Sequence, residues 1–377
     1  MPRPPSLVAW HSPEAAIIPG LVNLHTHLEL THLRGSNAEP DFYHWIQRLR
    51  RDKAQVTAEG FLAAARQGVR DAWAAGTTTV ADTGDSGAVS AALTELGGRG
   101  VVYQEIFGPH PDQAPAALAG LRASVDRLRA GAGPHVTIGV SPHAPYSVSA
   151  PLFSLVAGYA REEGLPLAVH LAESRAETAL VTRGEGPFAE LWRRRGIPLP
   201  IRAASPVAYL DMLGMLAPRT LVIHGVQVTS RDAAVLAERG ASVALCPRSN
   251  RRHGHGEPPV GVLREAGVGF GVGTDSVVSV ETVDLFADAR RVAELGGLDA
   301  AAALFTMTLG GARALGLGDE IGSLDVGKQA DLCLVALSPA TGSPDPLHQV
   351  LAAGAAAVRS VWVGGRKVWG DPLPRAA

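Results

Sequence analysis

The sequence has few cysteines and no long apolar run, and each shortage excludes a class of protein. Its only cysteines are Cys246 and Cys333, too few for a disulfide framework or a cysteine-rich zinc module. No segment approaches the roughly 20 uninterrupted apolar residues of a membrane span, and the opening MPRPPSLVAWHSPEAA lacks the apolar stretch of a secretory signal. These absences predict a cytoplasmic protein that is not inserted in a membrane.

The chain also lacks an excess of charge of either sign. It has 34 Lys and Arg against 36 Asp and Glu, a formal net charge of -2. A surface that binds nucleic acid or anionic lipid needs a positive excess. The balance predicts a small-molecule partner, with no nucleic acid and no membrane. It permits a homo-oligomer, for which the sequence picks no interface.

Short apolar runs alternate with longer Ala-, Leu- and Arg-rich stretches from Ile17 onward. The apolar runs read as eight strands, and they end near His25, Asp82, Phe107, His143, His170, His224, Cys246 and Asp275. The stretches between them, such as 57–73, 113–129, 150–163, 177–195 and 282–294, space apolar residues as helices do. This rhythm predicts an α/β fold, a (β/α)8 TIM barrel over residues 17–315.

After Leu315 the pattern changes. IGSLDVGKQADLCLVAL and VRSVWVGGRKVWG are short strand-like pieces with glycine turns and no barrel unit between them. They predict a small antiparallel appendage, formed by residues 1–16 and 316–377.

Titratable side chains stand at the carboxyl ends of the predicted strands. They are His25 and His27 on the first strand, His143 on the fourth, His170 and Glu173 on the fifth, His224 on the sixth and Asp275 on the eighth. Barrel enzymes gather their reactive groups at this edge. Residues two apart on a strand point to the same side, so His25 and His27 can reach one ion.

Neutral imidazoles with a carboxylate suit Zn²⁺, and less selectively Fe²⁺ or Mn²⁺. The predicted ligands of one divalent ion are His25, His27, His170 and Asp275. Such an ion lowers the pKa of its bound water and supplies a nucleophile at neutral pH. Glu173 and His224 are then predicted to move protons, as in a metal-dependent hydrolase.

Each of these histidines, taken alone, has a simpler reading as a hydrogen-bonded structural residue. His-x-His is frequent by chance, whereas its combination with His-x-x-Glu and Gly-Thr-Asp at barrel spacing is specific. His32, His253 and His255 lie in loops near predicted strand ends, and their roles stay open. A non-catalytic scaffold that keeps the barrel remains an alternative of another class.

The motifs resemble those of the amidohydrolase superfamily, most of all its deaminases and chlorohydrolases of purine, pyrimidine and triazine rings. They are PGLVNLHTHLEL (19–30), SPHAPYS (141–147), HLAES (170–174), IHG (223–225), CPRSN (246–250) and GTDS (273–276). The resemblance implies that the appendage is a small β-sandwich. It also implies one metal on the four predicted ligands, with Glu173 protonating a ring nitrogen and with His224 and Asp275 assisting the attacking water.

Several members of the superfamily bridge two metals with a carboxylated lysine from a barrel strand. The lysines here are Lys53, Lys328 and Lys367, and none lies in a candidate strand between His27 and His170. The sequence therefore predicts a single metal ion.

The resemblance also bears on the substrate. It implies that His143 in SPHAPYS contacts a purine. Glu29 and the following Arg34 resemble aminodeoxyfutalosine deaminases, which convert a benzoate-bearing 6-aminopurine nucleoside to its 6-oxo form in menaquinone biosynthesis. Arg34 and Arg248 are candidates to bind a substrate carboxylate, because a guanidinium offers it two parallel hydrogen bonds.

Other substrates of the same machinery stay open. They are S-adenosylhomocysteine, methylthioadenosine and adenosine, a guanine-type ring, or a ring that loses a different substituent. The segment RRHGHGEPPV (251–260) differs from the leucine-containing run of many relatives. The substrate-facing loop after the seventh strand is therefore not assigned.

Overall fold

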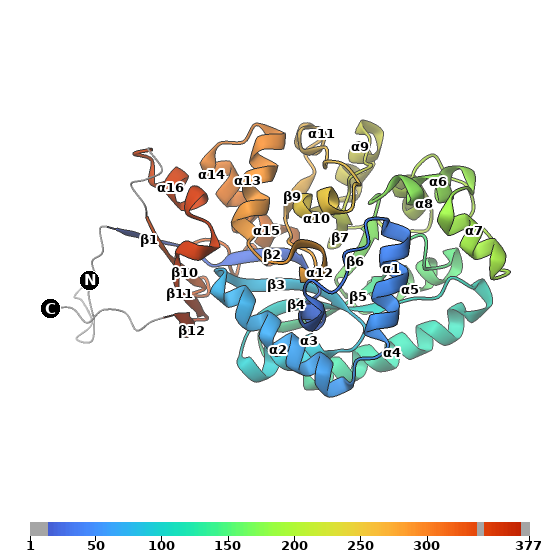
Figure 1. The fold of residues 1–377 in the computed structure, drawn as a ribbon, viewed down its shortest axis with the longest axis horizontal. Helices are drawn as coiled ribbons and strands as arrows, with labels where there is room; N and C mark the ends of the chain where they lie inside the picture. The colour runs from blue at the N-terminus through green and yellow to red at the C-terminus, as the bar shows by residue number, and fades with distance from the viewer. Residues whose placement is uncertain (1–13, 338–342, 371–377) are drawn as a thin grey trace.

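A computed structural model describes residues 14–337 and 343–370, and its main body is a barrel of eight parallel strands (Figure 1). Each strand pairs with the next along the chain. The strands are β2 (Leu21–Thr26), β3 (Thr77–Gly84), β4 (Arg99–Ile106), β5 (Val136–Pro142), β6 (Leu167–Leu171), β7 (Thr220–His224), β8 (Ser242–Leu245) and β9 (Gly269–Val272). The predicted (β/α)8 barrel is confirmed.

Three individual hydrogen bonds connect the first barrel strand to the segment that follows the last one, in place of a regular ladder. Asn23 Nδ2 donates to Thr274 Oγ1 over 2.9 Å, and Thr274 N donates back to Asn23 Oδ1 over 3.0 Å. Asp275 N donates to His25 O over 2.9 Å. This seam, made by Asn23, His25, Thr274 and Asp275, places the end of β2 directly against the segment that follows β9.

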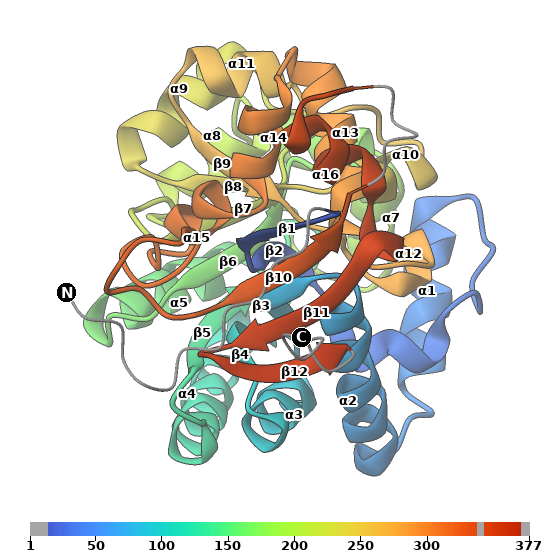
Figure 2. The same cartoon turned by 90° about the vertical axis from the view of Figure 1, so that its left-hand side faces the viewer.

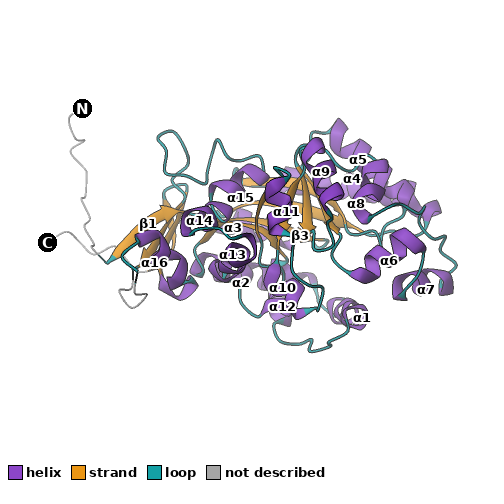
Figure 3. Cartoon of the chain, turned by 90° about the horizontal axis from the view of Figure 1, so that it is seen from above, coloured by secondary structure: helices purple, strands orange, loops and turns teal. Residues whose placement is uncertain are grey.

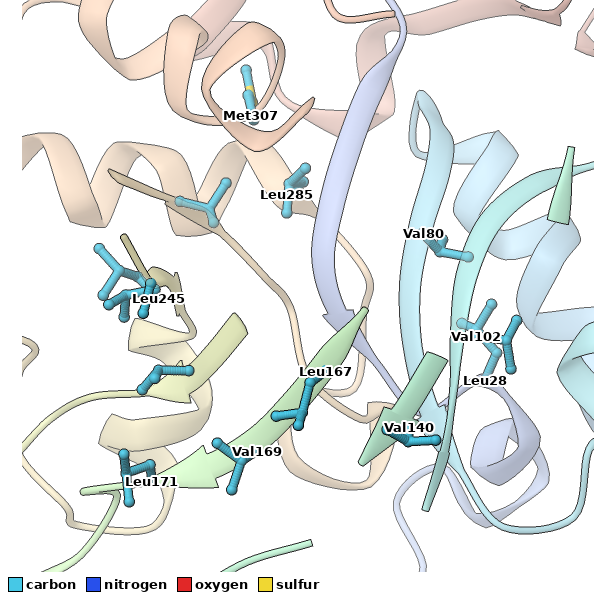
Figure 4. Close-up of a cluster of buried hydrophobic side chains, with 14 of the residues drawn as sticks. Leu28, Val80, Val102, Val140, Leu167, Val169, Leu171, Leu245, Leu285 and Met307 are labelled. Carbon is cyan, nitrogen blue, oxygen red and sulfur yellow. The ribbon is translucent and has the colours of Figure 1, made fainter. Parts of the chain in front are cut away.

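Side chains alternate between the inside and the outside of the barrel, as the two-residue period of a strand requires. The inside is filled by Val22, Leu24, Ala81, Val101, Tyr103, Ala168, Leu221, Ile223 and Ala244. Outward-facing neighbours, among them Val80, Val102, Val140, Val169 and Leu245, pack in the cluster that includes the helices (Figure 4). Burial on both faces explains why these strands read as continuous apolar runs.

Helices cover the outside of the barrel, at the positions that the sequence predicts for α2 (Ala58–Ala74), α4 (Ala114–Gly131), α5 (Ala150–Glu162) and α13 (Leu285–Gly296). The predicted helix over 177–195 is instead broken into α6 (Arg175–Arg183) and α7 (Pro187–Arg194). Gly184 and Gly186 lie between them with φ of 67° and 88°, a region that glycine adopts without strain.

The remaining helices are shorter, apart from α1. They are α1 (Phe42–Lys53), α3 (Ala88–Leu96), α8 (Pro206–Met212), α9 (Ser230–Arg239), α10 (Pro247–Arg252), α11 (Val260–Glu265), α12 (Val277–Val280), α14 (Ala300–Thr306), α15 (Leu309–Ala314), α16 (Pro346–Ala353), and the 3₁₀ turns η1 (Leu28–Leu33), η2 (Pro111–Gln113) and η4 (Ala355–Ala357). Within the described ranges, none of the helices is both apolar and long enough to cross a bilayer.

A second, antiparallel sheet has the order β1-β10-β11-β12 (Figure 2). Its strands are β1 (Ala15–Pro19), β10 (Leu332–Ala336), β11 (Val358–Val363) and β12 (Arg366–Gly370). The described residues thus form one four-stranded sheet, where the resemblance implies a sandwich. Residues 1–13 and 371–377, also assigned to this unit from the sequence, lie outside the described residues.

The boundary between the two sheets differs from the predicted one. Ile17 and Ile18 pair with Leu334 and Cys333 of β10, so they belong to the small sheet and not to the barrel. The chain crosses from one sheet to the other at Gly20, where a Cβ atom would lie 2.2 Å from Thr78 Oγ1. One apolar run therefore supplies a strand to each sheet, and the first barrel strand starts at Leu21.

A buried ion pair joins the barrel to the small sheet. Arg99 Nε, at the start of β4, lies 2.7 Å from Asp331 Oδ2, and Arg99 Nη2 lies 3.3 Å from Asp331 Oδ1. Gly364 N donates to the same Oδ1 over 2.7 Å. Both charged side chains are buried, so each depends on the other for its compensation.

We expect Asp331→Ala to lower the free energy of unfolding by about 3–5 kcal/mol, because Arg99 is left charged, buried and unpaired. Urea denaturation followed by circular dichroism measures the change. The control is Asp325→Ala, which removes an exposed carboxylate 3.9 Å from Lys328 Nζ and should cost less than about 0.5 kcal/mol. Similar, small losses in both variants would contradict the proposed link between the sheets.

Candidate active site

Four side chains from three strand ends converge at one point. Nε2 of His25 lies 3.4 Å from Asp275 Oδ1, and Nε2 of His27 lies 3.5 Å from the same oxygen. One ring nitrogen of each of His25, His27 and His170 lies within 4.8 Å of the others. The predicted metal ligands are therefore neighbours in space, although they are up to 250 residues apart in the chain (275 minus 25).

This cluster fits a divalent cation. His25 is fully buried, and neither of its ring nitrogens has a hydrogen-bond partner among residues 14–337 and 343–370. Nδ1 of His27 lies 2.8 Å from the Thr83 carbonyl oxygen; a proton on Nδ1 satisfies this contact and leaves the Nε2 lone pair facing Asp275. Burial and the neighbouring His25 lower the pKa of His27 to about 3, so this imidazole is neutral.

Asp275 completes the cluster as an anion. Burial acts to raise the pKa of its carboxyl, but the neighbouring imidazoles of His25, His224 and His27 hold it well below the usual range. Three imidazoles and one carboxylate form a donor set that suits Zn²⁺ and leaves room for a water molecule.

The backbone is strained at three strand ends of the site. Ala172, His224 and Asp275 have φ of 52°, 75° and 64°, in the left-handed region that residues with a Cβ rarely adopt. The seam holds the backbone of Asp275, and Ser276 N donates to its Oδ1 over 2.6 Å. Strain of this kind is typical of functional sites, where the surrounding structure enforces it.

Glu173 follows β6, and its backbone is held by a second glutamate. Glu177 Oε2 accepts a hydrogen bond from Glu173 N over 2.9 Å, and Glu177 Oε1 accepts one from Ala172 N over 2.8 Å. Ser174 caps the start of helix α6, because its side-chain oxygen accepts a hydrogen bond from Glu177 N. The sequence motif HLAES thus forms a rigid turn that presents the Glu173 side chain.

The Glu173 carboxylate has histidines on one oxygen and a tyrosine on the other. Its Oε1 lies 3.5 Å from His224 Nε2 and 3.4 Å from His255 Nε2, and Tyr146 OH donates to its Oε2 over 3.5 Å. Burial acts to raise the pKa of Glu173, but His224 and His255 outweigh it and lower the pKa to about 2. Glu173 is therefore ionised at neutral pH.

Two further predicted histidines are fixed by one hydrogen bond each. His224 Nδ1 lies 2.9 Å from Asn250 Oδ1, an acceptor that favours the proton on Nδ1 and leaves Nε2 free toward Glu173. His143 Nδ1 lies 2.7 Å from Ser147 Oγ. Burial lowers the pKa of His143 to about 3, so this side chain presents a neutral imidazole.

A cavity of about 200 Å³ has at its floor the polar side chains of His27, His143, His170, Glu173, His224 and Asp275. Its walls are apolar and largely aromatic, and comprise Leu30, Phe42, Trp45, Ile46, Leu49, Phe107, Tyr146, Phe188, Leu191 and Trp192. Much of this wall comes from α1 and α7, which lie at the end of the barrel away from the small sheet (Figure 1). An apolar slot with a few polar groups at one end suits a flat heterocycle.

Basic residues of α1 and the end of α7 line the rim of the cavity. Lys53 Nζ lies 2.6 Å from Glu29 Oε1 and 2.6 Å from Asp85 Oδ1, so its charge is compensated. Arg50 and Arg195 also line the cavity. Neither guanidinium has a carboxylate partner in the part of the chain that the structure describes.

Three residues predicted to bind substrate lie elsewhere. Arg34 forms an ion pair with Asp71 and does not line the cavity. Arg248 Nε donates to Asp288 Oδ2 over 2.9 Å, outside the cavity. Glu29 is buried and does not line the cavity, but it forms an ion pair with Lys53, which does. Arg34 and Arg248 are thus engaged with acidic side chains of the fold itself, and the structure places neither of them in the cavity.

Sequence reasoning missed Arg50, Arg195 and Glu105. Helix α1 is absent from the predicted helices, although Phe42, Trp45, Ile46 and Leu49 stand at i, i+3, i+4 and i+7 and form an apolar stripe. That spacing was an available signal for the helix and for the side of it that lines the cavity. Glu105 lies near the end of β4 and lines the cavity, where burial raises its pKa to about 8. A carboxylate at the end of an apolar strand was the available signal for Glu105.

Comparisons with known proteins agree with this geometry. The model of the amidohydrolase family matches residues 16–368. A 5-methylthioadenosine/S-adenosylhomocysteine deaminase of Syntrophobacter fumaroxidans is 33% identical over 375 residues, covering 94% of this chain and 80% of that protein. An aminodeoxyfutalosine deaminase of Deinococcus radiodurans is 34% identical over 320 residues, covering 80% of this chain and 74% of that protein.

A solved structure supports the same assignment. An adenosine deaminase from Xanthomonas campestris, with bound zinc, superposes with a TM-score of 0.81 and shares 32% identity, over 94% of this chain and 80% of that one. The family match extends over most of the residues described, both the barrel and the small sheet. This chain therefore belongs to the amidohydrolase family.

Proposed function

We propose that this protein is a hydrolytic deaminase of a 6-aminopurine nucleoside. The observation that carries the proposal is the position of Glu173, an ionised carboxylate beside the cluster of His25, His27, His170 and Asp275 on the floor of an apolar cavity. The names of the relatives support it, because they act on adenine nucleosides.

His25, His27, His170 and Asp275 would hold one divalent cation, and zinc suits this donor set best. The zinc bound to the similar Xanthomonas protein supports this choice. Such an ion, when bound, acidifies a water molecule so that it can act as a nucleophile near neutral pH.

Glu173 carries a proton in this proposal. Because it is ionised, it can take one proton from the attacking water and pass it to N1 of the purine. The oxygen then adds to C6, and N1 carries the new hydrogen. His224, with Nε2 free, takes the remaining hydroxyl proton and gives it to the amino group. Ammonia leaves and the 6-oxo purine remains.

The rest of the cavity positions the ring. His143 is neutral and lines the cavity beside Phe107, with ring centroids 4.8 Å apart, so it can form a hydrogen bond to a purine nitrogen. Tyr146 and Phe188 stack with centroids 4.3 Å apart in the wall. Apolar walls hold the heterocycle and exclude water from its reacting edge.

Aminodeoxyfutalosine, an intermediate of menaquinone biosynthesis, is the substrate we favour. Arg50 and Arg195 are cations at the rim of the cavity without a carboxylate partner in the described residues. A substrate that carries a carboxylate on its 5′ side would supply this partner. The relative from Deinococcus radiodurans, which has that activity in its name, supports the same choice.

We expect the zinc-loaded protein to convert aminodeoxyfutalosine faster than S-adenosylhomocysteine, methylthioadenosine, adenosine or guanine. Loss of the 6-amino chromophore and release of ammonia measure the rate. Failure to convert any adenine nucleoside would overturn the proposed deamination. Faster conversion of methylthioadenosine, which has no carboxylate, would agree with the proposed deamination but contradict the proposed preference for a substrate with a carboxylate.

Glu173→Gln should keep the fold and bind zinc as the unsubstituted protein does, but lose about 10²–10⁴-fold in kcat, because the amide cannot carry the proton. His170→Asn should lose both zinc and activity, since a ligand is removed. Metal analysis after dialysis, together with kcat, separates the two effects. A fully active Glu173→Gln protein would refute the proton-transfer role.

Arg50→Ala and Arg195→Ala should each raise KM for aminodeoxyfutalosine about tenfold, because each removes a charge-assisted hydrogen bond to the carboxylate. KM for adenosine should stay within about twofold in both variants, since adenosine has no such group. Arg34→Ala is the matched control and should leave both KM values unchanged, as Arg34 lies outside the cavity. An equal rise for both nucleosides would argue against a carboxylate site.

A further inference from the structure

One histidine next to Glu173 has no assigned task. His255 lies in the loop between α10 and α11, and only 8% of its surface is exposed. Its Nε2 lies 3.4 Å from Glu173 Oε1, and no other group among residues 14–337 and 343–370 forms a hydrogen bond with it. A buried ring nitrogen left without a partner is costly, so the carboxylate is the one group of the described residues that can compensate it.

The loop holds His255 in this position from three sides. His255 N donates to Asn250 O over 2.9 Å, and Gln227 Nε2 donates to His255 O over 2.9 Å. The ring of Phe42, on α1, packs edge-on against the imidazole with centroids 4.4 Å apart. The backbone and the ring are therefore both fixed before a substrate binds.

The sequence His-Gly-His-Gly makes this turn possible. Gly254 and Gly256 flank His255 with φ of 67° and 104°, a region that residues with a side chain rarely adopt. The other histidine of the loop, His253, is engaged differently, because its Nε2 lies 3.1 Å from Ser279 Oγ. Only one of the two histidines is thus directed at Glu173.

His224 does not donate to the same carboxylate oxygen in the tautomer that its contact with Asn250 favours. With the proton on Nδ1, toward Asn250 Oδ1, its Nε2 is a lone pair 3.5 Å from Glu173 Oε1. His255 Nε2, at 3.4 Å, is then the nearer nitrogen able to donate to that oxygen.

We propose that His255 is a positioning residue for Glu173: its Nε2–H donates to Oε1 and fixes the carboxylate, so that the other oxygen carries the proton to the ring. This inference rests on the proposed deamination. Without His255, the Glu173 carboxylate keeps, within the described part of the chain, only the long hydrogen bond from Tyr146 OH to Oε2, and the proton is delivered from a wider range of geometries. The expected cost falls on kcat and not on substrate binding.

The test is a pair of variants with side chains of similar length. His255→Gln places an amide nitrogen, which can donate, near the position of Nε2, and His255→Met cannot donate. We expect His255→Met to lower kcat about 10- to 100-fold, the range of one hydrogen bond to a charged group, with KM and zinc content within about twofold. His255→Gln should recover kcat to within about fivefold of the original rate.

Arg251→Ala, an exposed position at the base of the same loop, controls for disturbance of the segment and should keep the original kcat. Circular dichroism checks the fold of every variant. If His255→Met does not fold, His255→Asn replaces it, because its shorter amide keeps polarity but does not reach Glu173; it is expected to be as slow.

Two results would overturn the inference: an unchanged kcat in the variants that cannot donate, or a His255→Gln protein as slow as they are. The second result would show that the imidazole itself is needed. If the unsubstituted protein converts no adenine nucleoside, the proposed deamination fails instead, which is a separate outcome.

Discussion

The site depends on the seam that closes the barrel. Asp275 follows the last strand and the His25–His27 pair ends the first, and the hydrogen bond from Asp275 N to His25 O brings the two segments together. The reciprocal bonds between Asn23 and Thr274 fix their register. Without this closure, the carboxylate would not face the imidazoles, and no single cation could contact all of them.

The seam also explains why strain is tolerated at this end of the barrel. Left-handed backbone at His224 and Asp275 costs of order 1–3 kcal/mol for each residue. Neighbouring strands and their hydrogen bonds enforce both conformations. The opposite end is closed by apolar side chains and carries the small sheet, so packing and chemistry occupy different ends of one fold, as in other barrels of this type.

Much of this arrangement could be predicted from the sequence, because it follows from local patterns. The barrel strands are continuous apolar runs, and a histidine or carboxylate at the end of such a run must face the same edge as the others. His25, His170 and Asp275 could be found in this way. The resemblance to amidohydrolases added the predictions that Glu173 protonates a ring nitrogen and that His143 contacts a purine, which spacing alone does not give.

The cavity-lining arginines and the boundary between the two sheets could not be predicted from the sequence, because they depend on packing between distant segments. Arg34 and Arg248 were plausible carboxylate ligands until the fold gave them Asp71 and Asp288 as partners. Arg50 reaches the cavity only because α1, a helix with one buried residue, folds back across the barrel. The division of one apolar run at Gly20 was hidden for the same reason, since it requires knowledge of Thr78 and β10.

Helix α1 has a wider consequence. Seen from above, it lies outside the ring of barrel helices (Figure 3), and among its residues only Trp45 is buried. Its apolar face, with Phe42, Trp45, Ile46 and Leu49, lines the cavity, whereas the four proposed metal ligands come from the ends of barrel strands. Substitutions on this one helix can therefore change the shape of the substrate cavity and leave the ligand cluster intact.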